Sequence, residues 1–207
     1  MRPTPPRPAA SRWVIASSNA GKLREFRELL GGDGRIKFVT QGQLGVGDAE
    51  ETGLSFVENA LLKARHAAAA TGLPALGDDS GLCVDALDGA PGLYSARYAG
   101  GHGDARANIA KLLTALAGVP ETQRNAHFIA VIVLLRHAED PQPLIAQGIW
   151  RGRILDAPRG DGGFGYDPVF RPDGHACSAA ELDPALKNRI SHRGLALNAL
   201  QRQLPHL

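Results

Sequence analysis

The sequence predicts an α/β fold built on a long mixed central sheet with flanking helices. Strands and helices alternate along the first part of the chain, as they do where helices connect parallel strands. Two strands, residues 128–135 and 144–150, then follow each other without a helix, which indicates an antiparallel hairpin. The first of these strands is apolar on both faces, and such a strand is typical of the middle of a sheet.

The first half of the chain provides two strand–helix units. A capping box, Ser55-Phe56-Val57-Glu58, predicts where the second helix begins, because the Ser and Glu side chains can each bond the backbone N–H group of the other residue. The elements predicted before residue 75 are a strand at 13–16, a small-residue turn at 17–22, a helix with Leu23, Phe26, Leu29 and Leu30 on one face that ends at Gly31-Gly32, a strand at 36–40, a Gly-rich acidic loop at 42–53, and a helix from the capping box to a stop at 72–74.

The second half adds the hairpin and two capped helices. Asp104 and Ser191 are each placed to cap a helix N-terminus. The elements predicted here are a strand at 82–87, a Gly-rich loop at 88–103, a helix that carries Ile109, Leu112, Leu113 and Leu116 and ends at Gly118, the hairpin, a Gly-rich loop at 158–168, a capping-box pattern at 178–181 that Pro184 soon breaks, and a last helix running to Leu204.

The composition fits a soluble globular protein. The chain has 207 residues, of which 43% are hydrophobic and 21% charged, and its net charge is +2. A nucleic-acid-binding protein would carry a continuous basic stripe with interleaved aromatics, but the Arg residues are scattered and only 5% of the residues are aromatic. We expect a single domain at 12–207, preceded by a disordered Pro-rich segment at 1–11, and no nucleic-acid partner.

Cysteine usage and hydropathy indicate a cytoplasmic location. Cys83 and Cys177 are far apart, match no metal-ligand spacing and fit a reduced protein. No apolar run reaches the roughly 18 residues needed to cross a membrane, and the N-terminus lacks the apolar core of a signal peptide. We therefore expect no membrane partner.

The most informative segment is 76–85, where two adjacent aspartates, Asp78 and Asp79, stand at the start of an apolar strand. A second acidic pair, Glu50-Glu51, lies in the loop upstream. Buried carboxylates need a partner, and carboxylates from two loops suit a hard divalent cation such as Mg²⁺. The alternative is a tight turn in which Asp78 caps the end of a strand.

The turn at 17–22 is a candidate phosphate-binding loop. Backbone N–H groups at a helix N-terminus favour anions, Ser17 and Asn19 add side-chain donors, and Lys22 adds a positive charge. It is not a Walker P-loop, because Gly21 is its only glycine and Leu23 follows the lysine. The alternative is an ordinary capped surface helix.

The second predicted helix could complete such a site. Asn59 and Lys63 are four residues apart and therefore share a helix face, close in sequence to Glu58 and to the Glu50-Glu51 pair. The alternative is a solvated helix face with a surface ion pair.

Two further segments are suited to binding a purine base. The segment 162–168 places Phe164 and Tyr166 between glycines, and an aromatic ring there can either stack on a nucleobase or fold back onto the core. Ser191 is followed by His192 and Arg193 at the start of the last helix. An Arg can donate two hydrogen bonds to O6 and N7 of a 6-oxopurine, and a His can add a donor; alternatively, both residues simply decorate the helix start.

Together these motifs resemble those of the inosine triphosphate pyrophosphatase family, and most closely its bacterial dITP/XTP pyrophosphatases. The resemblance covers nearly everything from Trp13 to Leu200. It rests on six motifs: Ser-x-Asn-x-x-Lys at 17–22, Ala-Glu-Glu-Thr-Gly at 49–53, Phe-x-Glu-Asn-Ala-x-x-Lys-Ala at 56–64, Asp-Asp-Ser-Gly-Leu at 78–82, Gly-Gly-Phe-Gly-Tyr-Asp-Pro at 162–168 and Ser-His-Arg at 191–193.

The resemblance implies roles for individual residues. Asp79 is implied as the general base, and Glu50 and Asp79 are implied as ligands of Mg²⁺. The substrate-binding residues that it implies are Ser17, Ser18, Asn19, Ala20, Gly21, Lys22 and Lys63 for the triphosphate, Ser80 beside the substrate, Phe164 stacked on the base, Gly165, Tyr166 and Asp167 around the base, and Lys187, His192 and Arg193 at its edge. The family often has Thr where this chain has Ser17, so the hydroxyl is kept.

The resemblance also implies an assembly and a reaction. We expect a homodimer whose subunits have two lobes around a substrate cleft. The implied reaction is Mg²⁺-dependent hydrolysis of ITP, dITP, XTP and dXTP to the monophosphate and pyrophosphate, which keeps deaminated purines out of DNA and RNA. The main alternative is a nucleotide-binding module without catalysis, but such a module would not need water-activating carboxylates.

Overall fold

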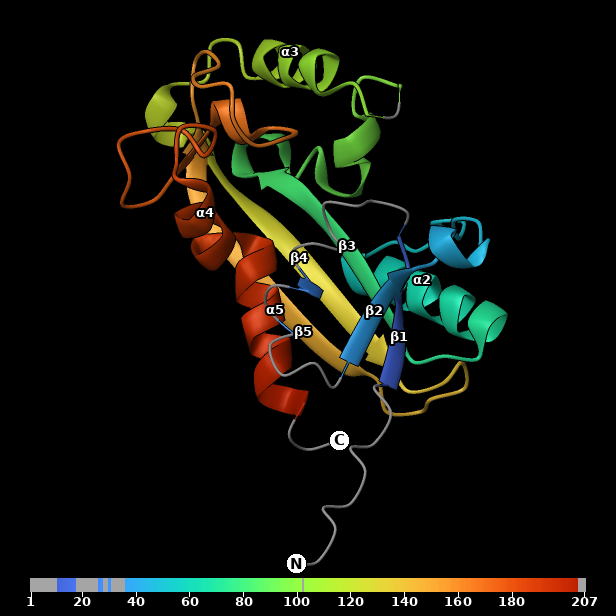
Figure 1. Ribbon diagram of the computed structural model, residues 1–207. Coiled ribbons are helices and arrows are strands. Elements are labelled where there is room, and N and C mark those ends of the chain that lie inside the picture. Colours follow the sequence, from blue (N-terminus) through green and yellow to red (C-terminus); the bar gives the residue numbers. More distant parts are fainter. Residues whose placement is uncertain (1–10, 18–25, 28–29, 31–35, 102, 205–207) are drawn as a thin grey trace, which may run out of the picture.

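The computed structural model describes residues 11–17, 26–27, 30, 36–101 and 103–204, and its elements are labelled as in Figure 1. A six-stranded sheet has the strand order β2-β1-β3-β4-β5-β6. The strands are β1 (Ser11–Ile15), β2 (Ile36–Thr40), β3 (Ala75–Val84), β4 (Asn125–Leu135), β5 (Leu144–Ile154) and β6 (Phe170–Pro172). The helices are α2 (Phe56–Thr71), α3 (Ala105–Ala115), α4 (Pro184–Ile190) and α5 (His192–Gln203), with short 3₁₀ helices η1 (Gly42–Leu44), η2 (Asp85–Leu87), η3 (Gly92–Arg97), η4 (Glu121–Gln123) and η5 (Asp167–Val169).

The sheet is mixed, which confirms the predicted α/β class. β1 runs parallel to β2 and to β3, whereas the pairs β3–β4, β4–β5 and β5–β6 are antiparallel. β3 pairs with β4 along its whole length but with β1 only through Ala75 and Leu76. From Gly77 onward, one edge of β3 therefore extends beyond the end of β1.

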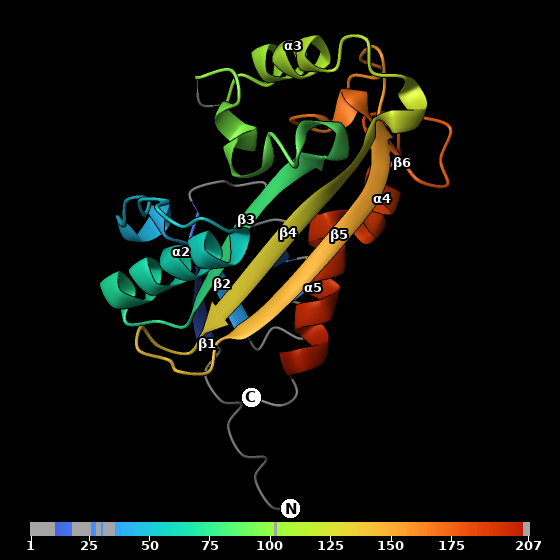
Figure 2. The same ribbon diagram turned by 180° about the vertical axis from the view of Figure 1, so that it is seen from behind.

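Helices cover the two faces of the sheet. α2 packs against β3 and β4 on one face, and α5 packs against β4 and β5 on the other (Figures 1 and 2). The approach is close, because a Cβ at Gly77 would lie 2.0 Å from the carbonyl oxygen of Ala60 in α2. A Cβ at Gly148 would likewise lie 2.0 Å from the carbonyl oxygen of His192 in α5. Glycine at these two positions lets each helix bring its side chains against the sheet.

Two large buried clusters form at the two ends of β3. One contains Leu76 near the start of the strand, together with Phe38 and Leu197. The other contains Val84 at the end of the strand, together with Phe128 and residues of α3. The predicted division into two lobes around a cleft stays a prediction, as does the disordered segment at 1–11, of which the described residues include only Ser11. No helix in the described part of the chain is long and apolar enough to span a membrane.

Locally encoded features match the sequence predictions. Ser55, Asp104 and Ser191 cap α2, α3 and α5, and each side chain accepts a backbone N–H group in the first turn. β2 has the predicted bounds, and α2 ends at Gly72, which adopts the left-handed conformation typical of that position. Most of the first predicted helix lies outside the described residues.

The boundaries of β3 were predicted wrongly. The strand begins at Ala75 rather than Leu82, and residues 85–87 form η2 instead of continuing it. Asp78 and Asp79 thus lie inside a strand, neither at its start nor in a turn. Aspartate is unfavourable in strands, so local preference argues against this arrangement. Cationic partners on both faces offset part of this cost.

A second prediction fails at residues 178–181. Ser178 donates its N–H group to Glu181 Oε2 at 2.8 Å, so half of a capping box forms. No helix follows directly, and α4 begins instead at Pro184, with Asp183 as its N-cap. Proline does not break this helix, because the first helical position needs no N–H donor.

The connection between β4 and β5 folds around a buried aspartate. The Asp140 carboxylate accepts backbone N–H groups from Arg136 at 2.9 Å and from Gln142 at 3.0 Å. The Arg136 guanidinium also binds this carboxylate, with Nε 2.8 Å from Oδ2. The hydrogen bonds from the Arg136 side chain outweigh the effect of burial and hold the pKa of Asp140 well below its ordinary value.

Asp140→Asn is expected to lower the free energy of unfolding near neutral pH, because Arg136 loses its charged partner. The loss should be on the order of 1 kcal/mol, since the Arg136 side chain is half exposed and solvent weakens the pair. The lowered pKa means that the advantage of the wild type is complete above the unfolded-state pKa of about 3.9. It disappears as the pH falls through the lower folded-state pKa. Thermal melts of both proteins across this range measure the difference. Equal destabilisation at acid and neutral pH would contradict a role for the ionised carboxylate.

Candidate active site

The adjacent aspartates of β3 serve opposite faces of the sheet, because side chains alternate along a strand. Asp79 contacts Lys63 of α2, whereas Asp78 contacts Arg193 of α5. Both are buried, with exposed fractions of 8% for Asp79 and 2% for Asp78. The two members of the Asp78-Asp79 pair therefore belong to two different clusters.

The cluster on the α2 face is a lysine between two carboxylates. Lys63 Nζ lies 2.7 Å from Asp79 Oδ1 and 2.7 Å from Glu51 Oε1. Arg97 of η3 approaches the same glutamate, with Nη1 3.5 Å from Glu51 Oε2. Two negative groups are thus held close together by cations, an arrangement that can bind a divalent ion or phosphate oxygens.

The pKa values of these groups shift for identifiable reasons. Burial raises the pKa of Asp79; Lys63 opposes this only in part, and Glu51 and Asp78 raise the pKa further. Burial also acts to raise the pKa of Glu51, but Lys63 and Arg97 outweigh it, so this pKa is lowered. Burial acts to lower the pKa of Lys63, but Asp79 and Glu51 outweigh it, so this pKa is raised. Asp79 is the carboxylate of the cluster whose pKa moves toward that of a proton acceptor working near neutral pH.

The loop that carries Glu50 and Glu51 is hydrogen-bonded to the start of α2. Asn59 is buried, and its Oδ1 accepts the N–H group of Gly53 at 2.8 Å. Glu58 accepts the N–H group of Leu54 at 2.9 Å, and Ser55 accepts that of Glu58 at 3.3 Å. Asn59 and Lys63 lie one turn apart on α2, as predicted. Asn59 holds the loop at Gly53, whereas Lys63 binds the carboxylates of Glu51 and Asp79.

The cluster on the α5 face is a buried ion pair. Arg193 Nε and Nη2 each lie 3.3 Å from Asp78 Oδ2, and Nη2 also lies 3.3 Å from Ser80 Oγ. Arg193 is 5% exposed. Its Cζ lies 5.9 Å from the centre of the Phe164 ring. The guanidinium is therefore held between β3 and the Gly-rich loop at 162–168.

That loop presents an aromatic ring flanked by two cations. Phe164 is 58% exposed. The second cation beside its ring is Lys187, whose Nζ lies 4.8 Å from the ring centre. Asp167 holds both parts in place, because its Oδ2 accepts the N–H group of Phe164 at 2.6 Å and binds Lys187 Nζ at 2.5 Å. A Cβ at Gly163, where φ is +73°, would lie 2.3 Å from Asp167 Oδ2, so this position requires glycine.

Tyr166 and His192 are buried and pack against core residues. Tyr166 folds back onto the core, and its hydroxyl donates to the carbonyl oxygen of Ser95 at 2.9 Å. Burial raises the pKa of Tyr166. The His192 ring stacks on Phe128, with ring centres 4.8 Å apart and planes 13° apart. Gly165 precedes Tyr166 with φ of +60° and turns the chain between Phe164 and the core.

The part of β3 that extends beyond β1 carries residues of both clusters. Ser17 and Asp78 each lie two residues beyond the paired residues Ile15 and Leu76, so Ser17 stands at the carboxyl end of β1 next to this edge. Ligands of α/β proteins bind where neighbouring strands diverge at their carboxyl ends. The rest of the predicted phosphate loop, Ser18, Asn19, Ala20, Gly21 and Lys22, lies outside the described residues.

Comparison with known proteins assigns the chain to a family. Residues 13–203 match the Ham1 family. The chain belongs to the Ham1 family. A dITP/XTP pyrophosphatase of Xanthomonas oryzae pv. oryzae is 66% identical over 191 residues, which are 92% of this chain and 96% of that protein.

Solved structures of the Ham1 family share the fold. A HAM1 protein from Coxiella burnetii superposes with a TM-score of 0.90 at 51% identity, covering 95% of this chain and 100% of the other. The Ham1 protein of Staphylococcus aureus gives a TM-score of 0.85 at 40% identity, covering 95% and 99%. The six motifs identified in the sequence all lie within the matched residues.

The carboxylates of the α2 face fit a magnesium ion. Within the described ranges, no group of three or more His, Cys, Asp and Glu side chains is arranged to hold a metal. Mg²⁺ usually takes only one or two protein carboxylates and completes its shell with water and phosphate oxygens, so Asp79 and Glu51 suffice. Glu50, the predicted ligand, is exposed and precedes Glu51 in the chain, and Asp78 is turned to the other face.

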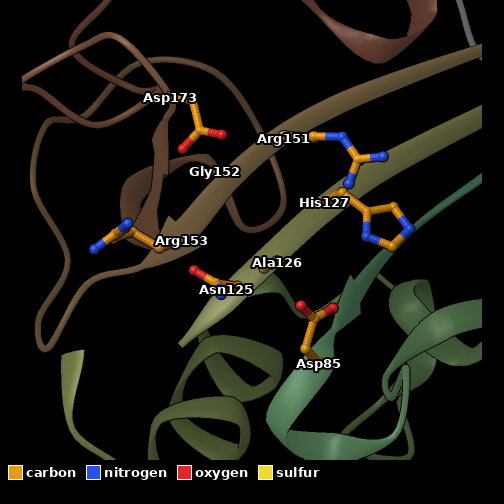
Figure 3. A pocket seen from close by; sticks show the side chains of 8 residues that line it. All are labelled: Asp85, Asn125, Ala126, His127, Arg151, Gly152, Arg153 and Asp173. Carbon is orange, nitrogen blue, oxygen red and sulfur yellow. The ribbon is translucent and has the colours of Figure 1, made fainter. Parts of the chain in front are cut away.

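A hollow of about 260 Å³ lies apart from the two clusters described above (Figure 3). Cross-strand pairing of Cys83 with His127, and of His127 with Arg151, puts it on the same face of the sheet as Asp79 but nearer the end of β3. Its lining residues are Asp85, Asn125, Ala126, His127, Arg151, Gly152, Arg153 and Asp173. None of the predicted site residues lines it.

Sequence reasoning missed two residues of the site region, Ser95 and Arg97, which were placed in a loop without a role. Ser95 accepts the N–H group of Leu82 at 2.9 Å and ties η3 to β3. A lone Arg within a Gly-rich apolar segment is the signal that could have identified Arg97.

Proposed function

We propose that this chain hydrolyses the non-standard purine nucleoside triphosphates ITP, dITP, XTP and dXTP to the monophosphate and pyrophosphate, with Mg²⁺ as its cofactor. The observation that carries the proposal is that two clusters share β3 beyond the end of β1: the Glu51–Lys63–Asp79 carboxylate cluster on the α2 face and the Arg193–Phe164–Lys187 cluster around an exposed ring on the α5 face. The first suits a metal-bound triphosphate and the second suits a base. The 66% identity to a protein named dITP/XTP pyrophosphatase supports the same substrate class.

Asp79 is proposed as a metal ligand and as the group that orients or deprotonates the attacking water. Glu50 or Glu51, or both, would complete the protein ligands. When bound, Mg²⁺ supplies neutralisation of the phosphates and polarisation of the attacked centre. The raised pKa of Asp79 suits a group that accepts a proton.

The triphosphate is proposed to lie between the end of β1 and α2. Ser17, with Ser18, Asn19, Ala20, Gly21 and Lys22, would bind it from the β1 side, and Lys63 would bind it from α2. Lys63 is charged at neutral pH, because its pKa is raised, and an ammonium can move from a carboxylate to a phosphate oxygen without a change of protonation.

The base is proposed to stack on Phe164, whose ring is exposed between the two cations. Lys187 and Arg193 flank this ring and would face the edge of the base, with Ser80 nearby. Asp167 orders the loop, while Gly165, Tyr166 and His192 support it from the core side.

The biological setting is also a proposal. Removal of deaminated purine nucleotides keeps them out of DNA and RNA, and this role requires access to the nucleotide pool of the cytoplasm. We propose a cytoplasmic homodimer that has neither nucleic acid nor membrane as a partner.

The reaction is tested by incubating the protein with ITP and identifying the phosphorus products, with and without Mg²⁺. The expected result is IMP and pyrophosphate in equal amounts, and a rate that falls at least about a hundredfold when a chelator removes the metal. Formation of IDP and orthophosphate would contradict the proposed bond cleavage. An undiminished rate in the chelator would contradict the proposed cofactor.

A further inference from the structure

We propose that Asp78 is a positioning residue for base selection, which holds the guanidinium of Arg193 in the orientation that meets the base. The inference rests on the proposed function of the same site. It gives a role to the aspartate that precedes the proposed general base in sequence.

The geometry of the pair carries the argument. Asp78 Oδ2 lies 3.3 Å from both Nε and Nη2 of Arg193, so the carboxylate binds along one edge of the planar guanidinium. Ser80 Oγ, also 3.3 Å from Nη2, is a second anchor from the same strand. An arginine side chain has several rotatable bonds, and contacts with β3 at two points fix the plane in which its donors lie.

The second cation beside Phe164 is held in the same way. Lys187 Nζ binds Asp167 Oδ2, and Asp167 is 3% exposed, as Asp78 is 2% exposed. Each cation next to the ring thus has a buried carboxylate that orients it. Such pairs are expected where the position of a charge matters, because a flexible exposed cation could provide attraction but no fixed hydrogen-bond direction.

Asp78 is separated from the metal-binding chemistry by the sheet itself. Its side chain lies on the α5 face, whereas Asp79, Lys63 and Glu51 form their cluster on the α2 face. Removing the charge of Asp78 should therefore alter the choice of base, whereas the loss of a like charge beside Asp79 should shift the Mg²⁺ titration alike for ITP and ATP.

The test is a double-mutant cycle read out as the ratio of kcat/KM for ITP to kcat/KM for ATP. It compares wild type, Asp78→Asn, Arg193→Gln and the double variant, each titrated with Mg²⁺. Asp78→Asn is expected to lower the ITP:ATP ratio by about tenfold or more, the loss expected for a misplaced bidentate contact. The double variant is expected to match Arg193→Gln within about twofold, because residues that act as one unit are not additive. The ratio does not depend on the fraction of active enzyme, so partial misfolding does not distort it.

Asp85→Asn is the matched control, since it makes the same chemical change at an exposed position of η2 and should leave the ratio unchanged. If Asp78→Asn does not fold, Asp78→Ser takes its place in the cycle, with the same expected outcomes. A further loss in the double variant, or a change in Mg²⁺ requirement that differs between ITP and ATP in either Asp78 variant, would overturn the proposal. An unchanged ratio in folded Asp78→Asn would also overturn it. A wild-type protein that hydrolyses neither nucleotide would instead refute the proposed function, and with it the premise of this inference.

Discussion

Asp79→Asn is expected to lower kcat for ITP hydrolysis by about a hundredfold or more while the fold stays intact. The amide is nearly the same size as the carboxylate, but it lacks the charge for metal binding and cannot accept the proton of water. Lys63 keeps Glu51 as a partner at 2.7 Å, so the substitution leaves no buried cation without a counter-charge. Steady-state kinetics with saturating Mg²⁺ measure the effect.

The stability of the same variant provides an independent check. The pKa of Asp79 is raised in the folded state, so ionising this group opposes folding once the pH exceeds its ordinary value of about 3.9. Asp79→Asn removes that cost, and its melting temperature near neutral pH should equal or exceed that of the wild type. Activity within a few-fold of wild type would remove Asp79 from the mechanism. A large loss of stability would show that the carboxylate is mainly structural.

Arg193→Ala is expected to erode base selection as well as affinity. A bidentate contact to O6 and N7 is worth about 1–3 kcal/mol of discrimination, and adenine lacks the O6 acceptor. The ITP:ATP ratio of specificity constants should therefore collapse. Guanine carries both acceptors, so the ITP:GTP ratio should change less. Kinetics with the three nucleotides measure both ratios.

The same substitution should also destabilise the protein, because it leaves the Asp78 carboxylate in a buried position without Arg193. Breaking a buried ion pair from one side costs about 3–5 kcal/mol. Arg193→Lys is the conservative comparison, since it keeps a charge near Asp78 but loses the planar fork. Equal losses with ITP, ATP and GTP would mean that Arg193 serves phosphate binding or structure and not the base.

The features that the sequence predicted correctly are mostly those encoded within a few residues. Ser55, Asp104 and Ser191 cap their helices through hydrogen bonds to N–H groups three residues away, and this spacing is visible in the sequence. The contact of Lys63 with Asp79 spans 16 residues but followed from two motifs that were already expected to share a site. The mixed sheet followed from the order of the elements.

The features that the sequence could not give depend on which face a side chain occupies. Once Asp78 and Asp79 lie within β3, alternation sends them to opposite faces, but the strand itself was predicted to start at Leu82. The partner of Asp78 is 115 residues away on α5, and nothing local to either residue predicts that they meet. Glu51 and Glu50 are likewise indistinguishable by type, and only the path of the loop places Glu51 at Lys63.

The central claim, selective pyrophosphohydrolysis of deaminated purine nucleotides, is tested most directly by competition in one tube. Wild-type protein is mixed with Mg²⁺ and equal concentrations of ITP, XTP, ATP and GTP, and the nucleotides are separated and quantified over time. The account predicts that ITP and XTP are converted to IMP and XMP with matching pyrophosphate, at least about tenfold faster than ATP is consumed. Consumption of ATP at the rate of ITP, or release of orthophosphate with diphosphate products, would contradict it.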